Sequence, residues 1–324
     1  KNYIEIRNLV FDGAMLSPNG IKCDYSHHVR ISCNTMKNFG SAGVATKFCD
    51  YVDALYNNIH HFGYNEGWSS GISLNSHQWT DKYQGFHSHV IGNIISGGVD
   101  GSNYHSDGNG IIMDLSNDSY KYSTANTPPV LIANNVVYQN GGRCFVNFVV
   151  TNIWHVHNTC YKNGLDGRLG APGEYVVNKS DNIKFINNVA FGWKKGGNCY
   201  WQMQGKNNKY VTNSYHNCSN IVPTAQSSGL IAADPYFVDP PAVDPKANKQ
   251  WAKAFPTWLI TNHFHLLPQS EVLGLGADPT SVGNPSTEIK NSLIHWLATD
   301  IRGKARPLNG GADLGAYQMQ SLKK

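Results

Sequence analysis

Hydrophobic and polar residues alternate in short runs along the first two thirds of the chain. One phrase recurs eight times: alternating apolar residues, then an asparagine, then usually a glycine, as in YIEIRNLVFDG (3–13) and VLIANNVVYQNG (130–141). The base period is about 24 residues, with three enlarged repeats. Such alternation is typical of half-buried strands. The asparagines that mark the repeats are Asn8, Asn34, Asn58, Asn93, Asn135, Asn158, Asn188 and Asn213.

A second alternating phrase follows most copies of the first, from GIKCDYS (20–26) to NCYWQMQ (198–204). Each repeat therefore contains two or three short strands joined by Gly/Asn turns and no convincing helix, which excludes helical repeats. Coils of this length predict an all-β fold, a single-stranded right-handed parallel β-helix of about eight coils stacked about 4.8 Å apart. Asparagine tolerates left-handed turns and can hydrogen-bond along a stack, so we expect an asparagine ladder at the turn.

The composition agrees with this interpretation. The chain contains 36 asparagines, 31 of them before residue 221, and only 15% charged residues, against about 25% in an average domain. Asparagine and glycine disfavour helical bundles, and no apolar run is long enough to span a membrane. A net charge of +4 spread along the chain does not favour a nucleic-acid partner, and we expect a monomer. The seven cysteines form no CxxC motif, which argues against zinc, and their odd number leaves at least one free thiol.

The chain changes character after residue 220. Residues 233–249 are rich in proline and aspartate, while 251–260 and 286–301 have the pattern of short amphipathic helices. We therefore predict two regions, a β-helix over 1–220 and a C-terminal segment over 221–324 that caps it or packs against its side. Exposed coil ends are open sheet edges that need such a cover.

The coil length, the asparagine pattern and the strand phrases resemble the pectate-lyase-like superfamily of right-handed parallel β-helices over residues 1–220. The stretches GFHSHVIGN, HSDGNGIIMD, NNVVYQNGGR and GEYVVNKSDNIKFINNVA are similar to secreted β-helix proteins associated with polysaccharide breakdown. The resemblance implies secretion, with a signal peptide that would precede Lys1, and a polysaccharide as partner. The superfamily contains lyases, hydrolases, epimerases and phage tailspikes, so it leaves the activity open.

Aligning the second phrase coil by coil predicts which side chains face outward. The inward pairs would be Ile21/Cys23, Val44/Thr46, Ile72/Leu74, Ile111/Met113, Cys144/Val146, Tyr175/Val177 and Cys199/Trp201. One outward row would be Asp24, Lys47, Asn75, Asp114, Asn147, Asn178 and Gln202. The neighbouring row would be Gly20, Gly43, Gly71, Gly110, Arg143, Glu174 and Asn198, with the glycines leaving room for a ligand.

Insertions at 63–86 and 98–128 are expected to wall a cleft over these rows. They carry aromatic residues suited to sugar stacking, namely Tyr64, Trp68, Trp79, Tyr83, Tyr104, Tyr120 and Tyr122. The substrate-binding residues that we predict are Asn75, Asn147, Asn178, Trp68, Tyr104 and His87.

The densest candidate chemistry lies in NYHSDGNGIIMD (103–114). Asp107 and Asp114 are candidate ligands for calcium, which prefers several oxygen donors, and Asn109 or Glu174 would add to them. His105 precedes this pair and is a candidate catalytic residue.

Two enzymatic hypotheses follow. A lyase acting on a uronic-acid polymer needs a base, for which Lys47 or Lys179 is available, and a group that neutralises the substrate carboxylate, such as Arg143 or calcium. A glycoside hydrolase needs two carboxylates, and Asp114 and Glu174 would lie about 10 Å apart, two coils from each other. An epimerase or a non-catalytic, tailspike-like binding module remains an alternative.

Overall fold

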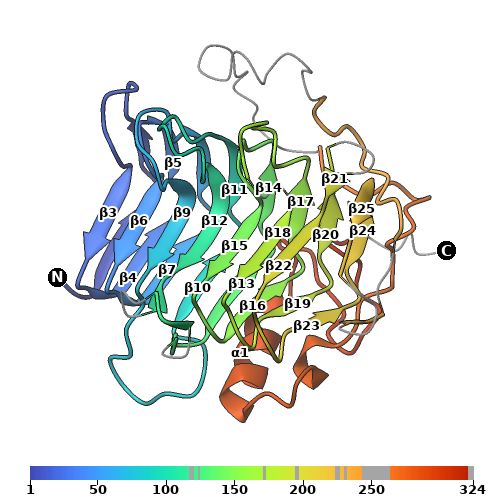
Figure 1. Ribbon diagram of the computed structural model, residues 1–324. Helices are drawn as coiled ribbons and strands as arrows, with labels where there is room; N and C mark the ends of the chain where they lie inside the picture. Colours follow the sequence, from blue (N-terminus) through green and yellow to red (C-terminus); the bar gives the residue numbers. More distant parts are fainter. Residues whose placement is uncertain are drawn as a thin grey trace.

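The protein forms a right-handed parallel β-helix, as the sequence predicts, in which three parallel sheets wind around a common axis (Figure 1). The computed structural model describes residues 1–116, 120–122, 125–170, 173–193, 197–222, 227–229, 232–242 and 263–319. Each coil contributes one strand to each sheet, so every strand pairs in parallel with the equivalent strand of the next coil. None of the described helices is long and apolar enough to cross a membrane.

The three sheets are named A, B and C in the order in which a coil visits them. Sheet A contains β1 (Ile4–Arg7), β4 (His27–Ser32), β7 (Asp50–Leu55), β10 (Ser88–Ile91), β13 (Val130–Ala133), β16 (Ile153–Val156), β19 (Lys184–Ile186), β23 (Lys209–Val211) and β26 (Ser227–Ser228). Sheet B contains β2 (Val10–Asp12), β5 (Thr35–Phe39), β8 (Asn58–Phe62), β11 (Ile94–Gly98), β14 (Val136–Tyr138), β17 (Thr159–Tyr161), β20 (Val189–Phe191) and β24 (Ser214–His216). Sheet C contains β3 (Ile21–Asp24), β6 (Val44–Lys47), β9 (Ser70–Asn75), β12 (Asn109–Asp114), β15 (Phe145–Phe148), β18 (Tyr175–Asn178) and β22 (Tyr200–Met203). Two short strands, β21 (Gly197–Asn198) and β25 (Cys218–Asn220), pair separately.

The core is a continuous column of inward-facing side chains from all three sheets. In the first coils it consists mainly of aliphatic residues, such as the fully buried Ile31, Ile59 and Ile72. Towards the C-terminal coils aromatic rings replace them: Phe185 stacks on Tyr175 at 4.7 Å and on Tyr210 at 5.5 Å. Stacked rings repeat at about the spacing of the strands, so the same pairing that aligns the backbone also aligns the core.

A buried asparagine ladder runs along the turn between sheets A and B. The Nδ2 of each member donates to the Oδ1 of the next, at 2.9–3.1 Å, and the backbone N–H donates to the same oxygen. Its members are Asn34, Asn57, Asn93, Asn135, Asn158, Asn188 and Asn213.

The prediction of the ladder needs two corrections. The member from the third coil is Asn57 rather than Asn58, which begins β8, and in the first coil Leu9 takes the ladder position in place of Asn8. The left-handed conformation belongs to the residue before each ladder asparagine, as at Asn134 (φ 54°) and Asn187 (φ 58°). Ladder asparagines are therefore selected for hydrogen bonding along the stack, and the residue before each of them makes the turn.

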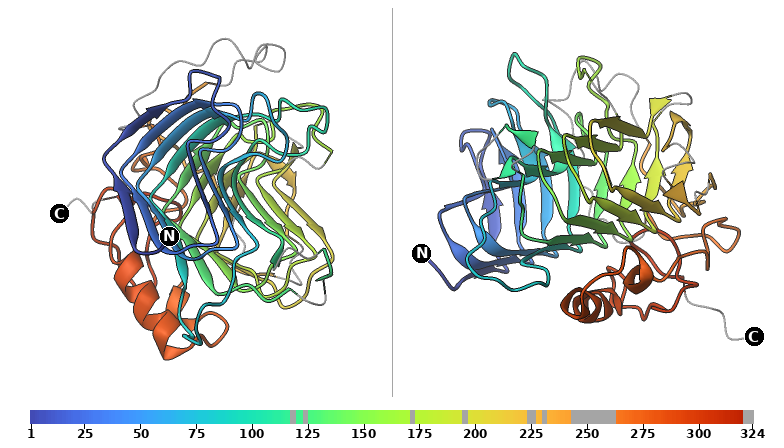
Figure 2. Two further views of the ribbon diagram at one scale, coloured as in Figure 1. Left: turned by 90° about the vertical axis from the view of Figure 1, so that its left-hand side faces the viewer. Right: turned by 60° about the horizontal axis from the view of Figure 1, so that its bottom comes forward.

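The C-terminal segment packs on the outer faces of sheets A and B, and it lies alongside the coils in Figure 2. On sheet A, Leu293 and Leu297 of α1 (Thr287–Leu297) join a cluster that contains Trp154. On sheet B, Phe237 and Phe264 contact the outward face in the same way. The amphipathic pattern at 286–301 thus forms α1, preceded by the short 3-10 helix η5 (Pro279–Ser281), whereas the helix predicted at 251–260 lies outside the described residues. The outer face of sheet C carries neither cluster.

Two disulfides, neither of them predicted from the sequence, link segments of successive coils. Cys144 is bonded to Cys160, and Cys199 is bonded to Cys218. Cys23, Cys33 and Cys49 are free thiols. The first bond joins the residue before β15 of sheet C to β17 of sheet B, and the second joins the residue before β22 of sheet C to β25.

Replacing a ladder asparagine is expected to destabilise the fold. Asn158→Ala would leave Asn135 N, Asn135 Nδ2 and the Ile132 carbonyl without their partners in the interior. We expect the free energy of unfolding to fall by about 3 kcal/mol, measured by urea titration. Asn291→Ala, at an exposed position of α1, is the control and should change it by less than about 0.5 kcal/mol. Equal effects of the two substitutions would contradict a stabilising role for the ladder.

Candidate functional site

A groove of about 540 Å³ lies on the outer face of sheet C, the face that the C-terminal clusters leave open. Its floor is apolar, formed by Ile112, Val146 and Val176 from three successive coils, with Phe148 and Trp201 packed beside them. The register pairs Ile112 with Val146, Val146 with Val176, and Val176 with Trp201. Because these side chains alternate with the core residues, the groove is built directly on the stacked strands.

A row of polar side chains borders this floor, at the end of the same strands. Lys47, Asn75 and Asp114 are paired in register on β6, β9 and β12, and Asn178 follows two coils later on β18. Asn75 Nδ2 donates to Asp114 Oδ2 at 2.9 Å. The Oδ1 of Asn178 is buried and has no hydrogen-bond partner among the described residues, so it is available to accept a hydrogen bond from a ligand hydroxyl. The structure thus brings four of the predicted residues to one groove.

The other side of the groove is formed by Ser106, Asp107 and Arg143. Arg143 Nη1 donates to the Ser106 carbonyl at 2.6 Å. Asp107 accepts hydrogen bonds from Ser106 Oγ at 2.9 Å and from Asn109 Nδ2 at 2.7 Å. Asp100, which is 1% exposed, holds this loop by accepting from the backbone N–H groups of Ser106 and Asp107. The carboxylate of Asp107 is therefore held in position by its own loop.

Burial changes the acid–base properties of these groups. Desolvation, together with the nearby charge of Asp107, raises the pKa of Asp114 to about 7, although Asn75 and Lys47 oppose the change. Desolvation also raises the pKa of Asp107, against hydrogen bonds and the charge of Arg143. Burial lowers the pKa of Arg143 to about 10. Near neutral pH one carboxyl of the groove can therefore exchange a proton while its arginine stays charged.

Aromatic side chains stand around the groove. Trp68 lines it and stacks on Tyr104 at 4.8 Å, with both rings mostly exposed. Tyr120 also lines it, with its ring edge-on to Phe148 at 6.2 Å. Trp201 lines the groove as well, although the coil-by-coil alignment of the repeats predicted that it faces the core. Exposed rings of this kind offer flat apolar surfaces to sugar rings.

In two coils, the predicted outward row is displaced by one residue from the row that faces outward in the structure. In β15 and β22 the residues facing outward are Val146, Phe148, Trp201 and Met203, and not Asn147 or Gln202. Asn147 is fully buried, where it hydrogen-bonds with His155 Nε2 at 3.0 Å, and Gln202 bonds with Tyr210. Both faces of β15 carry apolar residues because one lines the core and the other the groove, so alternation alone could not fix the register.

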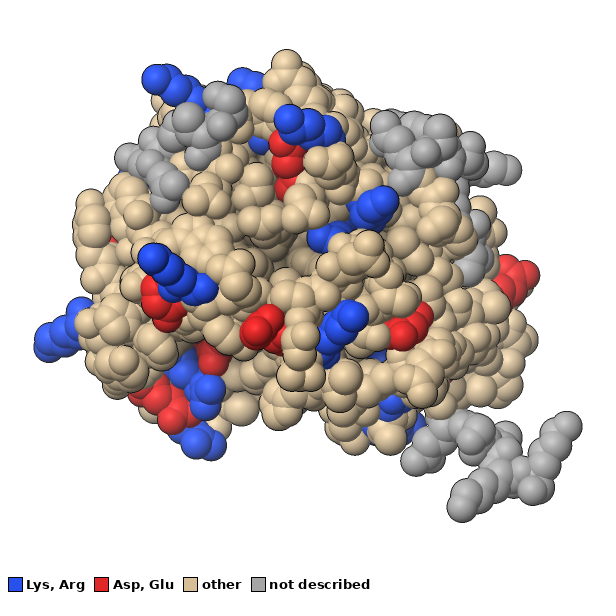
Figure 3. All heavy atoms as spheres, turned by 90° about the horizontal axis from the view of Figure 1, so that it is seen from below, with Lys and Arg blue, Asp and Glu red and all other residues tan. Residues whose placement is uncertain are grey.

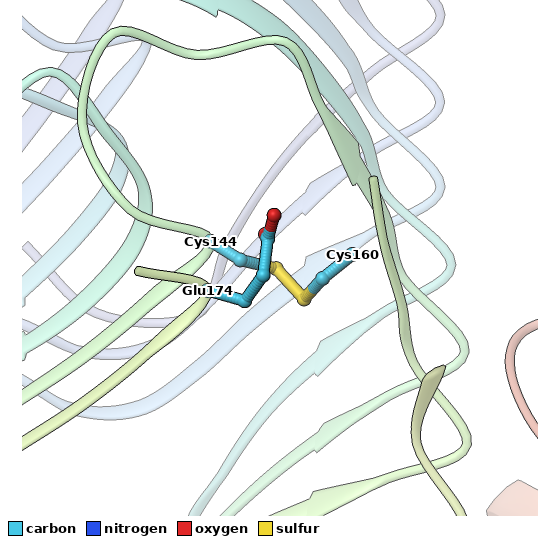
Figure 4. A group of neighbouring side chains, drawn as sticks. All are labelled: Cys144, Cys160 and Glu174. Carbon is cyan, nitrogen blue, oxygen red and sulfur yellow. A yellow bond between two sulfur atoms is a disulfide. The ribbon is translucent and has the colours of Figure 1, made fainter. Parts of the chain in front are cut away.

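Glu174, predicted to be catalytic, lies inside the coil beside the Cys144–Cys160 disulfide (Figure 4). It is 0% exposed and ends a second amide ladder, since its two oxygens accept from Asn163 N at 2.9 Å and Asn163 Nδ2 at 2.7 Å. Burial raises the pKa of Glu174 to about 8, against these two hydrogen bonds. Glu174 is a structural residue of the interior, and it is not part of the groove.

The glycine row also faces inward. A side chain at Gly71 would place its Cβ 2.4 Å from Ile95 Cγ2, and one at Gly110 would place it 2.2 Å from Val137 Cγ1. These glycines allow sheets B and C to approach closely in the core. They do not leave room for a ligand, contrary to the expectation from the sequence.

The histidines selected from the sequence lie outside the groove. His87 is buried against sheet A, where its Nδ1 hydrogen-bonds with Asp50 and its Nε2 with the Tyr83 carbonyl, both at 2.9 Å. Although burial disfavours the charged ring, these hydrogen bonds raise the pKa of His87. His105 contacts Arg168 at 3.3 Å and the Asp100 carbonyl at 3.2 Å, and it does not line the groove. Lys179, the alternative base, does not line it either.

The groove residues do not form a calcium cage. Calcium requires six to eight oxygen ligands. The two oxygens of Asp107 already accept from Ser106 and Asn109, Asp114 Oδ2 accepts from Asn75, and the Arg143 cation lies close to Asp107. Across the described parts of the chain, three His, Cys, Asp or Glu donors converge only at Cys144, Cys160 and Glu174, two of which share a disulfide.

Acidic and basic residues are sparse elsewhere on the molecule. On the face shown in Figure 3, red and blue side chains are few and lie near one another among uncharged residues. Several of those at the surface are simple ion pairs, such as Arg30 with Asp53 at 3.0 Å. In the groove, by contrast with this exposed pair, Asp107 and Arg143 are each only 9% exposed.

Comparison with known proteins finds a distant structural likeness. No family model and no curated protein matches the chain. Among solved structures, the chain is similar to the crystal structure of pectate lyase Pel9A, with 14% identity and a TM-score of 0.46 over 91% of this chain and 73% of the other. The architecture described above rests on the strand pairing of this chain.

The raised pKa of Asp114 predicts a pH-dependent stability. An unfolded aspartate titrates near pH 3.9, so between about pH 4 and 7 the native protein retains a proton that the unfolded chain has lost. The free energy of unfolding should therefore fall as the pH rises through this window. Asp114→Asn removes this contribution, and the difference between wild type and variant should change by about 2–4 kcal/mol from pH 4 to 7 in urea titrations.

Glu174→Gln is a comparison for that measurement, since it should show a similar change between about pH 5 and 7. Because the pKa of Glu174 is about 8, its own contribution continues to change above pH 7. A difference between wild type and Asp114→Asn that stays constant across the window would contradict the raised pKa of Asp114.

Proposed function

We propose that this protein is an extracellular carbohydrate-active enzyme, a polysaccharide lyase that cleaves a uronic-acid-containing polymer by β-elimination. The observation that carries the proposal is the sheet C groove, where Lys47, Arg143, Asp107 and Asp114 surround an apolar floor. A sugar ring has apolar faces and a polar edge, and the groove offers a matching surface for each. The guanidinium of Arg143 suits a substrate that carries carboxylates.

The residues divide into roles that β-elimination requires. We assign Arg143 to pair with the substrate carboxylate, which makes the hydrogen on the adjacent carbon more acidic. Lys47, in its neutral form, accepts that proton while the neighbouring carbon–oxygen bond breaks and a carbon–carbon double bond forms. Asp114, protonated near neutral pH, gives its proton to the departing glycosidic oxygen. Atoms and charge balance in this sequence, and no metal takes part in it.

A glycoside hydrolase is the second candidate, and one observation favours it. Asp114 with a pKa of about 7 has the property expected of a general acid, and Asp107 is a second carboxyl in the same groove. The pair predicted from the sequence, Asp114 with Glu174, is not available because Glu174 is buried in the interior. A basic residue, Lys47, and a cation, Arg143, beside the carboxyls favour the lyase. An epimerase would share the proton abstraction but would leave the polymer intact.

Two features support an extracellular location. The Cys144–Cys160 and Cys199–Cys218 disulfides are of the kind that persist in oxidising compartments. The groove also lies on the outer face of the β-helix that neither described C-terminal cluster covers, where a long polymer could reach it from the side.

The base role of Lys47 can be tested by substitution. The enzyme is first screened on pectate, alginate, glucuronan and neutral glycans, following the ultraviolet absorbance of the unsaturated product and the appearance of new reducing ends. On the substrate that it cleaves, Lys47→Met should lower kcat about 100-fold or more, because a positioned base contributes at least that much. Lys22→Met, on the adjacent strand β3 and exposed, is the control and should keep wild-type activity.

The same assay separates the candidates. New reducing ends without the absorbance would identify a hydrolase, and a change of sugar configuration without chain cleavage would identify an epimerase. Full activity in Lys47→Met would contradict the base assignment, and binding without turnover on every polymer would favour a binding module.

Chelation tests the metal-free mechanism. Because both carboxylate oxygens of Asp107 and the Oδ2 of Asp114 already accept hydrogen bonds, we expect kcat to change less than about twofold in excess EDTA. Loss of activity that is restored by added Ca²⁺ would show that substrate and protein hold the ion together, and it would overturn this part of the proposal.

A further inference from the structure

Two free cysteines lie against each other in the first two coils. Cys23 is in β3, and Cys49 follows the end of β6, the strand that pairs with β3. Their Sγ atoms are 3.6 Å apart, and Cys49 Sγ also donates to the Cys23 carbonyl at 3.3 Å. Cys49 is fully buried, whereas Cys23 is partly exposed. The third free cysteine, Cys33, is exposed and has no such neighbour in the described residues.

We propose that Cys23 and Cys49 form a third disulfide, which links the first coil to the second. The register pairs Cys23 with Thr46, and Cys49 lies in the turn after β6, so the bond would close at the corner between sheets C and A rather than between paired strand residues. The sulfurs need to approach by only about 1.5 Å to reach bonding distance. The two bonds already present, Cys144–Cys160 and Cys199–Cys218, are formed under the same oxidising conditions.

The reaction needs an oxidant, for which we name a small-molecule or protein disulfide. Cys23 is the accessible member, although the hydrogen bond with Cys49 and burial raise the pKa of its thiol; once deprotonated, Cys23 attacks that disulfide, and one thiol of the oxidant leaves. The thiolate of Cys49 then attacks Cys23 Sγ in the mixed disulfide, and the second thiol leaves. Two protein thiols are thus oxidised and one external disulfide is reduced to two thiols. The hydrogen bond from Cys23 lowers the pKa of Cys49, which favours the thiolate form of the resolving residue.

The bond would fix the strand end that carries Lys47. Cys49 is two residues beyond Lys47, and its Sγ donates to the Lys47 carbonyl at 3.4 Å. This consequence for the groove rests on the proposed function, whereas the disulfide itself does not. The first coil is also the outer edge of sheets A and C, where a covalent link limits fraying.

Mass spectrometry of the full chain tests the proposal. The protein is incubated with oxidised glutathione, denatured without reductant, and alkylated with iodoacetamide. We expect one alkylated cysteine, Cys33, and a linked peptide pair containing Cys23 and Cys49. Cys33→Ser should give no alkylation, and Cys49→Ser should give two alkylated or glutathione-bearing cysteines. Three alkylated cysteines in the oxidised wild type, or a linkage of Cys33 to either partner, would overturn the proposal.

Hydrogen exchange then measures what the bond does. Amides of Ile21–Asp24 should exchange at least tenfold faster in Cys49→Ser than in oxidised wild type, with Cys33→Ser as control. Equal exchange would overturn the stapling role, while the mass measurement reports on the bond independently. Polymer cleavage is assayed separately, so a failure of the proposed function would leave both readouts unchanged.

Discussion

Parallel stacking is the constraint on which the rest of this molecule depends. Each coil must repeat the backbone path of the one before it, because every strand forms its hydrogen bonds with the equivalent strand about 4.8 Å away. A side chain is therefore always next to its counterparts in the neighbouring coils. This is why buried amides satisfy one another in a ladder, why aromatic rings stack in the core, and why glycines recur where sheets B and C approach most closely.

The same constraint produces three long outer faces that differ in what covers them. The C-terminal segment buries apolar patches on sheets A and B, whereas the apolar floor of sheet C belongs to neither of these clusters and lies at the base of the groove. An apolar surface left open, bordered by polar groups and flanked by exposed aromatic rings, has the character of a ligand site. The position of the groove thus follows from the division of the outer surface among the three sheets.

The chain places few charges on its surface but concentrates several within this groove. Partial burial makes the carboxyl of Asp114 a proton donor near neutral pH, and the loop organised by Asp100 holds Asp107 and Ser106 beside Arg143. Neither effect comes from a single residue. The raised pKa of Asp114 and the placement of Asp107 beside Arg143 both depend on contacts between neighbouring coils. These contacts exclude water and so strengthen the interactions between the charges.

The architecture could be predicted from the sequence alone, because the period of about 24 residues and the recurring asparagines directly reflect the repeating backbone. The sequence also predicted that Lys47, Asn75, Asp114 and Asn178 lie in one row, since apolar and polar residues alternate clearly in the strands that carry them. The other positions of the candidate site residues depend on the tertiary structure. Only the packed coils show that both faces of β15 carry apolar residues, that Glu174 turns inward, and that His87 and His105 make other contacts, because burial depends on what a neighbouring coil places opposite each residue.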